Sequence, residues 1–357
     1  MVYLFLFAIV AIAFLLRNQQ KNLQIMPFVL LAIFAALRYG FGNDYFSYYR
    51  NFHDMKWQGH AILDDPLFVI LNKICPNFYI FIAVTSIIFL VSISILVMKN
   101  VDSKYVWVSV LIFVINPALF LMNLSAIRQC LAMCLFIAAT PFILKRKILP
   151  YTVLVLLAFF LHKSAIILLP MYFITDRPVG KRWVASVIAI ATVILIFPDL
   201  RMHLRYFFVF FDESNYIHYL ESSLGNTLRA TILTAIYFIY ILGNLHRLKG
   251  KDLVYAKLYL VGTLCGIFAY RLSIFTRPQM YFDIFSVIAL PTILKINIET
   301  VPAEVDSAYV IKSLWNCANR YALPTLIFII YGLRLYSFFT NPMWSSFTEY
   351  ETIFSTM

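Results

Sequence analysis

The chain has 357 residues, of which 62% are hydrophobic and only 13% are charged, and its mean hydropathy is +0.83. Apolar blocks recur along the whole length, which excludes a soluble globular protein and predicts an integral membrane protein. Alternating ten-residue apolar strands are absent, so the predicted spans are helices.

The predicted fold is an all-α, polytopic bundle of about 11 to 12 transmembrane or partly spanning helices. The whole chain, 1–357, is predicted to be a single transmembrane domain. Twelve apolar segments are candidate spans. They are 1–16, 23–37, 78–98, 105–122, 126–144, 148–161, 165–175, 183–198, 229–246, 253–270, 278–294 and 321–337. The segments 148–161 and 165–175 are short. They reach roughly 16 to 21 Å, against a hydrocarbon core of about 30 Å, so we expect them to meet part-way across.

The distribution of basic residues predicts the topology. No basic residue precedes the first span and Arg17 and Lys21 follow it, which places the N-terminus outside the cytoplasm. Because successive spans cross the membrane in alternate directions, 17 Lys and Arg and six acids then lie on the cytoplasmic side. The other 12 Lys and Arg and 11 acids lie on the outer side. The inside excess (17 − 6 = 11) accounts for almost all of the net charge of +12, so the charge is a topology signal and predicts no nucleic-acid partner. The largest cytoplasmic loop is 295–320, and the external motif loops are 38–77, 123–129, 199–228 and 271–278.

Arginine is enriched on the expected outer side, with nine Arg and three Lys there against six Arg and eleven Lys inside. The nine are Arg38, Arg50, Arg128, Arg201, Arg205, Arg229, Arg271, Arg277 and Arg334. A topogenic signal has no reason to prefer guanidinium over ammonium, whereas the planar guanidinium fork matches phosphate oxygens. The enrichment therefore predicts an anionic ligand. The alternative for any one Arg is snorkelling or pairing with an external acid.

The external segment 38–65 carries several candidates. Gly40 and Gly42 permit a tight turn or close backbone approach. Asp44 is positioned to cap a short aromatic helix that begins before Tyr48, and Asp65 precedes Pro66, a usual entry to a helix. Capping is the structural interpretation of both acids. The functional one is that a carboxylate among tyrosines accepts hydrogen bonds from sugar hydroxyls.

Two more external segments place arginine at helix starts. If Ser125 is the N-cap of the span 126–144, Arg128 falls in the first turn, where a cation needs a negative partner. Free backbone N–H groups, Arg128 and the Gln129 amide would then form a phosphate site. Arg277 precedes Pro278 and repeats this pattern together with Arg271.

The residues around these helix starts also have structural interpretations. After Arg277, Tyr281 is either an interfacial residue or a hydroxyl donor, and Asp283 is expected in a salt bridge. Gly262 and Gly266 form a GxxxG pattern, typical of close helix packing.

His162 and Lys163 separate the two short apolar segments, so we expect them at depth in a protein-lined cavity. His162 suits a general base near neutral pH, although a lone His is more often structural. The loop 199–228 is aromatic-rich and is expected to fold back onto the membrane.

An ordered set of motifs resembles the EpsG/Wzy family of bacterial polysaccharide polymerases over residues 38 to about 170. The set is Arg38-x-Gly-x-Gly-x-Asp-x-x-x-Tyr48, Asp65-Pro-Leu-Phe, Ser125-Ala-Ile-Arg-Gln-x-Leu-Ala and Leu157-Ala-x-x-x-His-Lys-Ser-Ala. The resemblance implies a GT-C-like glycosyltransferase of the bacterial inner membrane, with a periplasmic N-terminus and active site. It also implies that O-antigen or exopolysaccharide grows on undecaprenyl pyrophosphate. The implied partners are undecaprenyl-pyrophosphate-linked oligosaccharides, membrane lipids and a chain-length regulator. Family members often carry Glu where this chain has Asp65, which leaves open whether the shorter acid reaches substrate.

The residues and the resemblance lead to one predicted mechanism, in which an acceptor hydroxyl displaces lipid pyrophosphate from the anomeric carbon. Arg128 and Arg277, with Arg38 and Arg271 behind them, are predicted to hold the diphosphate, and His162 or Asp44 to take the proton. Gln129, Tyr281, Lys163, Asp65 and Tyr48 are predicted substrate-binding residues. No cofactor is predicted, although Asp64 and Asp65 keep a Mg²⁺ role open. The competing functions are an O-antigen ligase and a membrane O-acetyltransferase.

Overall fold

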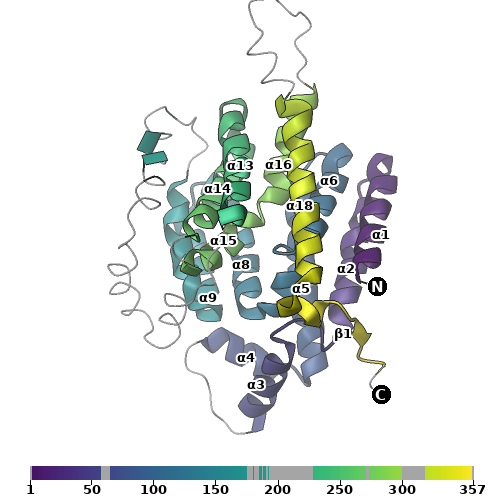
Figure 1. Cartoon of the computed structure of the whole chain (residues 1–357). Coiled ribbons are helices and arrows are strands. Elements are labelled where there is room, and N and C mark those ends of the chain that lie inside the picture. Colours follow the sequence, from purple (N-terminus) through teal and green to yellow (C-terminus); the bar gives the residue numbers. More distant parts are fainter. Residues whose placement is uncertain are drawn as a thin grey trace, which may run out of the picture. The chain divides into compact units, whose positions relative to one another are not determined.

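The computed structural model describes residues 2–57, 65–174, 228–270, 273–299 and 318–355, with a few single positions between 180 and 192. The chain divides into two compact units. Figure 1 labels most of their helices and strands. The first unit comprises Met1–Phe173 and Phe328–Met357, and the second comprises Ile174–Ile327. Helices dominate both units, and the two strands described are two residues long each.

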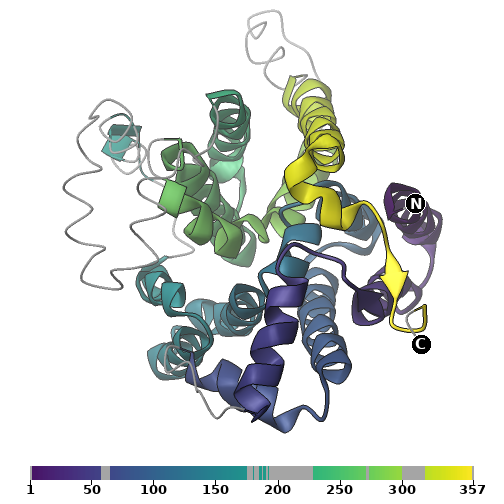
Figure 2. The same cartoon turned by 60° about the horizontal axis from the view of Figure 1, so that its bottom comes forward.

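Six helices form the body of the first unit, and Figure 2 shows several of them end-on. They are α1 (Val2–Leu15), α2 (Met26–Ala36), α5 (Phe78–Asn100), α6 (Val106–Ile115), α8 (Ile127–Leu144) and α9 (Ile148–Leu161). Helix α1 packs on α2 and α6, α2 packs on α5, and α8 packs on both α5 and α9.

Helix α5 shows why the sequence folds in this way. Its 23 residues are apolar around the whole circumference, and the Asn77 side chain caps its start by accepting a hydrogen bond from the Ile80 N–H at 2.9 Å. Phe81 and Ile93 lie in the core while Ile87 and Val91 remain exposed. A helix that is apolar on its exposed face as well as its buried face suits lipid rather than water.

Within the described residues, three helices are long and apolar enough to cross a membrane: Phe78–Asn100, Ile127–Leu144 and Arg320–Thr340. A fourth span results if the bent pair Ser273–Asp283 and Ser286–Glu299 is counted as one. Several further apolar helices are shorter. The chain is therefore an all-α membrane protein, as its composition predicts.

Eleven of the twelve predicted spans contain a described helix, and most of 183–198 lies outside the described residues. The segment 105–122 was expected to be one span but is interrupted. Helix α6 ends at Ile115 and α7 (Leu121–Ser125) follows a turn at Asn116 and Pro117, because a residue before proline is disfavoured in helical conformation.

Two other predicted spans also depart from a straight α-helix. The segment 278–294 bends by 60° between α15 (Thr276–Asp283) and α16 (Ser286–Glu299). The segment 165–175 is largely a 3₁₀ helix, η4 (Lys163–Phe173), with Pro170 inside it.

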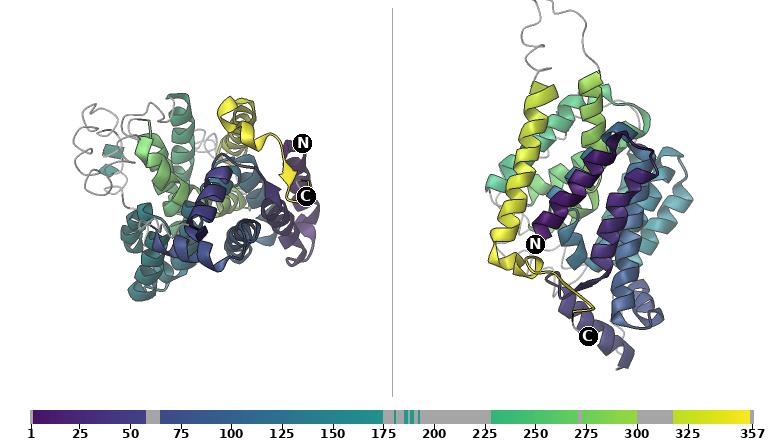
Figure 3. Two further views of the ribbon diagram at one scale, coloured as in Figure 1. Left: turned by 90° about the horizontal axis from the view of Figure 1, so that it is seen from below. Right: turned by 90° about the vertical axis from the view of Figure 1, so that its right-hand side faces the viewer.

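The chain's C-terminal segment lies on the Gly-rich segment 38–44. After α18 (Leu323–Thr340), strand β2 (Glu351–Thr352) pairs antiparallel with β1 (Arg38–Tyr39). The Tyr350 hydroxyl donates to the Phe34 carbonyl at 2.7 Å, and the Phe347 ring is fully buried. We call residues 341–353 the C-terminal strap. The right-hand view of Figure 3 shows it crossing from the end of α18 towards β1.

The second unit contains α13 (Leu228–Asn244), α14 (Gly250–Phe268), α15 and α16, with α14 packed on the other three. Gly262 and Gly266 of α14 face α15, which confirms that the GxxxG pattern marks close packing. A Cβ built on Gly262 would lie 2.8 Å from Asp283 Oδ1 and 3.1 Å from the Asp283 backbone nitrogen.

We predict that Gly262→Ala lowers the stability of the purified protein by about 1–3 kcal/mol, because the added methyl group meets backbone that cannot move aside easily. Gly332→Ala is the matched control, since Gly332 is exposed within α18 and no atom lies within 4 Å of the place that its added methyl group would take. The control should be neutral or stabilising. Thermal unfolding in detergent measures both, and equal midpoints would contradict the close packing of α14 on α15.

Candidate active site

The hairpin of α8 and α9 brings two predicted site residues to the same end of the first unit. The two helices pack along each other and are joined by residues 145–147, so they run antiparallel. Arg128 is the second residue of α8, and His162 directly follows α9. Helices α3 (Tyr45–Trp57) and α4 (Pro66–Ile74) lie beneath this end in Figure 1, with α4 in contact with α9 and α3.

Arg128 forms an ion pair with Asp65, and the distance from Arg128 Nη1 to Asp65 Oδ2 is 2.7 Å. The two side chains differ in exposure, at 40% for Arg128 and 7% for Asp65. The negative partner that a cation at a helix start requires is therefore supplied here by the protein itself. For Arg128, the structure shows the pairing alternative considered from the sequence.

Asp65 holds this position because α4 begins immediately after it. Pro66 is the first residue of α4, and the Asp65 carbonyl accepts the first helical bond, from the Val69 N–H at 3.1 Å. The predicted helix entry is confirmed. Its side chain makes no capping hydrogen bond, so the carboxylate is directed to Arg128 instead.

Tyr48 completes a three-residue cluster. It lies in α3, and its hydroxyl accepts a long hydrogen bond from the Arg128 backbone N–H at 3.5 Å. Its ring packs against Phe68, with 5.8 Å between the ring centroids. Burial raises the pKa of Tyr48, and the nearby Arg128 only partly offsets this effect, so the phenol stays protonated at neutral pH.

The Arg128 guanidinium is hydrogen-bonded within the protein and is also partly exposed to solvent. Its Nη1 bonds Asp65 and the side chain also interacts with the Tyr48 hydroxyl, yet 40% of the side chain remains exposed to solvent. The Phe68 ring lies under one part of the group, with its centroid 5.9 Å from Cζ. An oriented guanidinium with an accessible edge can bind an anion in a bidentate way.

The start of α8 differs from the expectation. The prediction that Ser125 is its N-cap is wrong, because Ser125 ends α7 and Ala126, with φ −91° and ψ 57°, precedes α8. No side chain caps the helix start, and the Ser125 Oγ is buried without a partner in the described part of the chain.

Asp44, Gln129 and Lys163 lie in different settings. Asp44 is exposed and directly precedes α3, as predicted, and its carbonyl accepts from the Tyr48 N–H at 2.9 Å. Gln129 is almost fully buried in α8. Lys163 is partly buried and begins η4.

His162 lies at the break between α9 and η4, as the two short apolar segments predict. Its backbone is extended, with φ −162° and ψ 116°. Its N–H donates to the Ala158 carbonyl at 2.9 Å, and its own carbonyl accepts from the Ala165 N–H at the same distance. The side chain is partly buried.

Arg38 is in the interior, at 1% exposure. Its Nη1 donates to the Ala35 carbonyl and to Ser86 Oγ, the latter at 2.6 Å, and its Nη2 donates to the Leu124 carbonyl at 3.2 Å. Burial lowers the pKa of the guanidinium to about 10, with the Coulombic effects of Tyr45, Cys130 and Tyr350 opposing the shift. Arg38 therefore stays charged at neutral pH.

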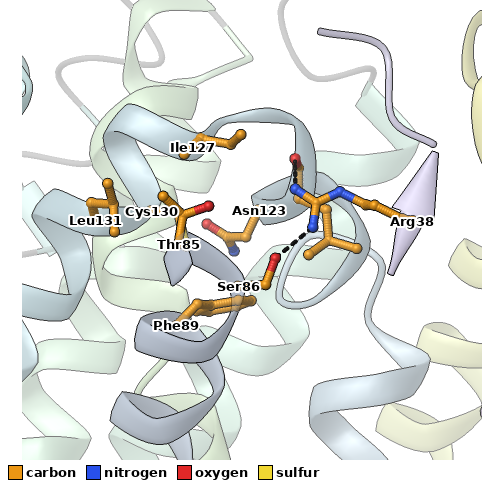
Figure 4. Close-up of a pocket in the computed structure, with 9 residues that line it drawn as sticks. Arg38, Thr85, Ser86, Phe89, Asn123, Ile127, Cys130 and Leu131 are labelled. Carbon is orange, nitrogen blue, oxygen red and sulfur yellow. Dashed lines mark hydrogen bonds between the residues drawn. The ribbon is translucent and has the colours of Figure 1, made fainter. Parts of the chain in front are cut away.

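A small pocket adjoins this guanidinium (Figure 4). Arg38, Ser86 and Asn123 line its polar side, and Phe89 and Leu131 are among its apolar residues. The space among these side chains has room for about one water molecule.

The remaining predicted residues belong to the second unit or lie outside the described residues. Arg277 is the second residue of α15, as predicted, and is partly buried, while Tyr281 is fully buried. Asp283 accepts from Gln279 Nε2 at 2.9 Å. Outside the described residues lie Arg271, Asp64, the motif loop 199–227 and most of the loop 295–320.

In the described ranges, no group of three His, Cys, Asp or Glu side chains is arranged to hold a metal ion. The absence of a cofactor stays a prediction. Sequence reasoning missed Ser86 and the C-terminal strap, which contact the motif segment 38–44. Phe347 and Tyr350 gave a weak signal, as aromatic residues in the segment after the last predicted span.

The fold and the cluster of Arg128, Asp65 and Tyr48 define a membrane-embedded helical protein with an oriented arginine at a helix start. A family model described as the EpsG family matches residues 21–301, more than three quarters of the 357 residues. The chain belongs to the EpsG family. This membership indicates a polysaccharide-polymerase-like function of the glycosyltransferase type, and the match extends well beyond the motifs at 38–170. No curated protein and no solved structure matches the chain.

Proposed function

We propose that this EpsG-family protein is an O-antigen or exopolysaccharide polymerase. It transfers a growing glycan from undecaprenyl pyrophosphate to a lipid-linked repeat unit at the periplasmic face of the bacterial inner membrane. The family membership supports the reaction class. The observation that carries the site assignment is the Arg128 guanidinium, which Asp65 holds at one nitrogen while 40% of the side chain stays exposed.

In the proposed step, the acceptor sugar hydroxyl attacks the anomeric carbon of the donor, and the bond from that carbon to the pyrophosphate oxygen breaks. The leaving diphosphate gains negative charge as this bond breaks. The open edge of Arg128 stabilises that charge, and Asp65 keeps the guanidinium oriented before the reaction begins, so no reorganisation is needed in the transition state. Tyr48, as a neutral phenol, supports the same turn of α8 through the Arg128 backbone.

The proton of the attacking hydroxyl passes to a general base, for which His162 and Asp44 are the two candidates. His162 adjoins the end of the hairpin that carries Arg128, and an imidazole accepts a proton readily near neutral pH. Asp44 is an exposed carboxylate one turn before Tyr48 in the chain. Lys163, which follows His162 and is partly buried, is a further residue of the first unit proposed to bind the lipid-linked substrate. The roles of Gln129, Arg271, Arg277 and Tyr281 stay predictions from the sequence. The reaction needs no nucleotide.

We predict that Arg128→Lys abolishes most long-chain polymer, because a single ammonium cannot both bond Asp65 and present a planar pair of donors. The loss of one preorganised donor typically costs about 10²- to 10³-fold in rate. Gel analysis of surface glycan should show single repeat units without long chains, which also separates a polymerase from a ligase, whose loss leaves no repeat unit transferred.

The matched control is Arg17→Lys, which changes the same residue type at a position outside the proposed site, where the guanidinium bonds the Phe14 carbonyl and lies over the Phe14 ring. It should leave polymer length unchanged. Normal long chains from a well-inserted Arg128→Lys protein would reject the proposed site.

We predict that one of His162→Gln and Asp44→Asn lowers the elongation rate at saturating substrate by about 10²-fold or more, as expected for a general base. Elongation by purified protein with lipid-linked repeat units is the measurement. His246→Gln and Asp54→Asn are the controls, because both side chains are exposed and lie outside the proposed site. Full activity in both test variants would exclude both candidates.

We predict that Ser47→Cys reacts with a membrane-impermeant maleimide in intact spheroplasts, whereas Gln20→Cys reacts only after permeabilisation. Both positions are exposed, and they lie in segments expected on opposite sides of the membrane. The four described native cysteines are buried, which limits background labelling. The reverse pattern would place the cluster on the cytoplasmic side and overturn the periplasmic site.

A further inference from the structure

A guanidinium with almost no solvent exposure is unusual unless it has charged or several polar partners, because its desolvation is costly. Arg38 has no carboxylate partner among the described residues. Its acceptors are instead the Ala35 carbonyl at the end of α2, Ser86 Oγ in α5 and the Leu124 carbonyl in α7. One side chain thus joins three elements that are far apart in the sequence.

The contact with Leu124 bears directly on Arg128. Leu124 is the next-to-last residue of α7, and only Ser125, Ala126 and Ile127 separate it from Arg128. The last carbonyls of a helix lack internal partners, and a cation there is favourable. No side-chain cap fixes the start of α8, and the bond from Arg38 ties the preceding turn to a part of the chain that is distant in sequence.

A second contact from the same segment reaches this turn. Gly42 has φ +111°, and a Cβ built on it would lie 2.9 Å from Ser125 Oγ. The backbone after Arg38 therefore packs directly on the residue after Leu124, and only glycine permits this approach. Ser86 in turn fixes the guanidinium, since its Oγ accepts from Arg38 and donates to the Ile82 carbonyl at 2.7 Å.

We infer that Arg38 is a positioning residue for the polymerisation reaction: it fixes the α7–α8 turn through the Leu124 carbonyl and thereby aims the Arg128 guanidinium, without touching substrate. This inference rests on the proposed role of Arg128. The burial of Arg38 supports it, because a side chain with 1% exposure presents almost no surface to a substrate, although a small pocket adjoins it (Figure 4).

A double-mutant cycle on the rate of elongation by purified protein tests the inference. Arg38→Lys keeps the positive charge but cannot reach acceptors in several directions. We expect it to lower kcat about tenfold in the otherwise native protein, with KM changed less than about twofold. In the Arg128→Lys background, Arg38→Lys should lower kcat less than about twofold, because the group that it positions is already lost.

The alternative roles give a different result. A residue that contacts substrate on its own, or one whose loss only reduces the folded fraction, lowers activity by the same factor in both backgrounds. Equal factors would overturn the inference while leaving the role of Arg128 intact. If Arg128→Lys alone kept full activity, the proposed function itself would fail.

Ser86→Ala provides a milder version that removes one acceptor of Arg38 and creates little space. It should lower kcat about two- to fivefold in the otherwise native protein. In the Arg128→Lys background it should lower kcat less than about twofold. It keeps the inference testable if Arg38→Lys does not fold. An equal effect of Ser86→Ala in both backgrounds would contradict the inference.

Discussion

The buried guanidinium of Arg38 satisfies carbonyl groups at the ends of two interrupted helices, α2 and α7. In an apolar environment, a backbone carbonyl without a partner costs several kcal/mol, so a helix can end inside such a bundle only where another group bonds its last carbonyls. Arg38 provides these bonds from one side chain. The break before α8, and with it the position of Arg128, depends on this arrangement.

The same relation between helix breaks and polar residues recurs along the chain. Asn116 and Pro117 end α6, His162 separates α9 from η4, and α15 and α16 meet at a 60° bend. Each break releases backbone groups from helical bonding and brings polar side chains to a place that a continuous apolar helix would exclude. Function in membrane proteins concentrates at such breaks because irregular backbone is tolerated only where protein or a water-filled cavity surrounds it.

Local features of the sequence predicted the helices and several of their ends. Pro66 marked the start of α4, Pro278 the first turn of α15, and the polar pair at 162–163 the end of α9. Interactions across long separations carry no such local pattern. The Asp65–Arg128 pair spans 63 residues and the Tyr350–Phe34 bond spans 316. Ser125 was predicted as a cap because its type and position suit one, whereas the structure has the short helix α7 ending at Ser125.

Two arginines expected on the same side of the membrane use the guanidinium group in opposite ways. Both terminal nitrogens of Arg38 donate hydrogen bonds to protein acceptors, whereas Arg128 bonds Asp65 through one nitrogen and its side chain stays 40% exposed. An excess of Arg over Lys is therefore not a direct measure of ligand contacts, because the fork that suits phosphate also suits several backbone carbonyls at once. The two uses are connected in this protein. A guanidinium can be preorganised for an anion only if the turn that carries it is rigid, and here the rigidity comes from a second guanidinium buried behind it.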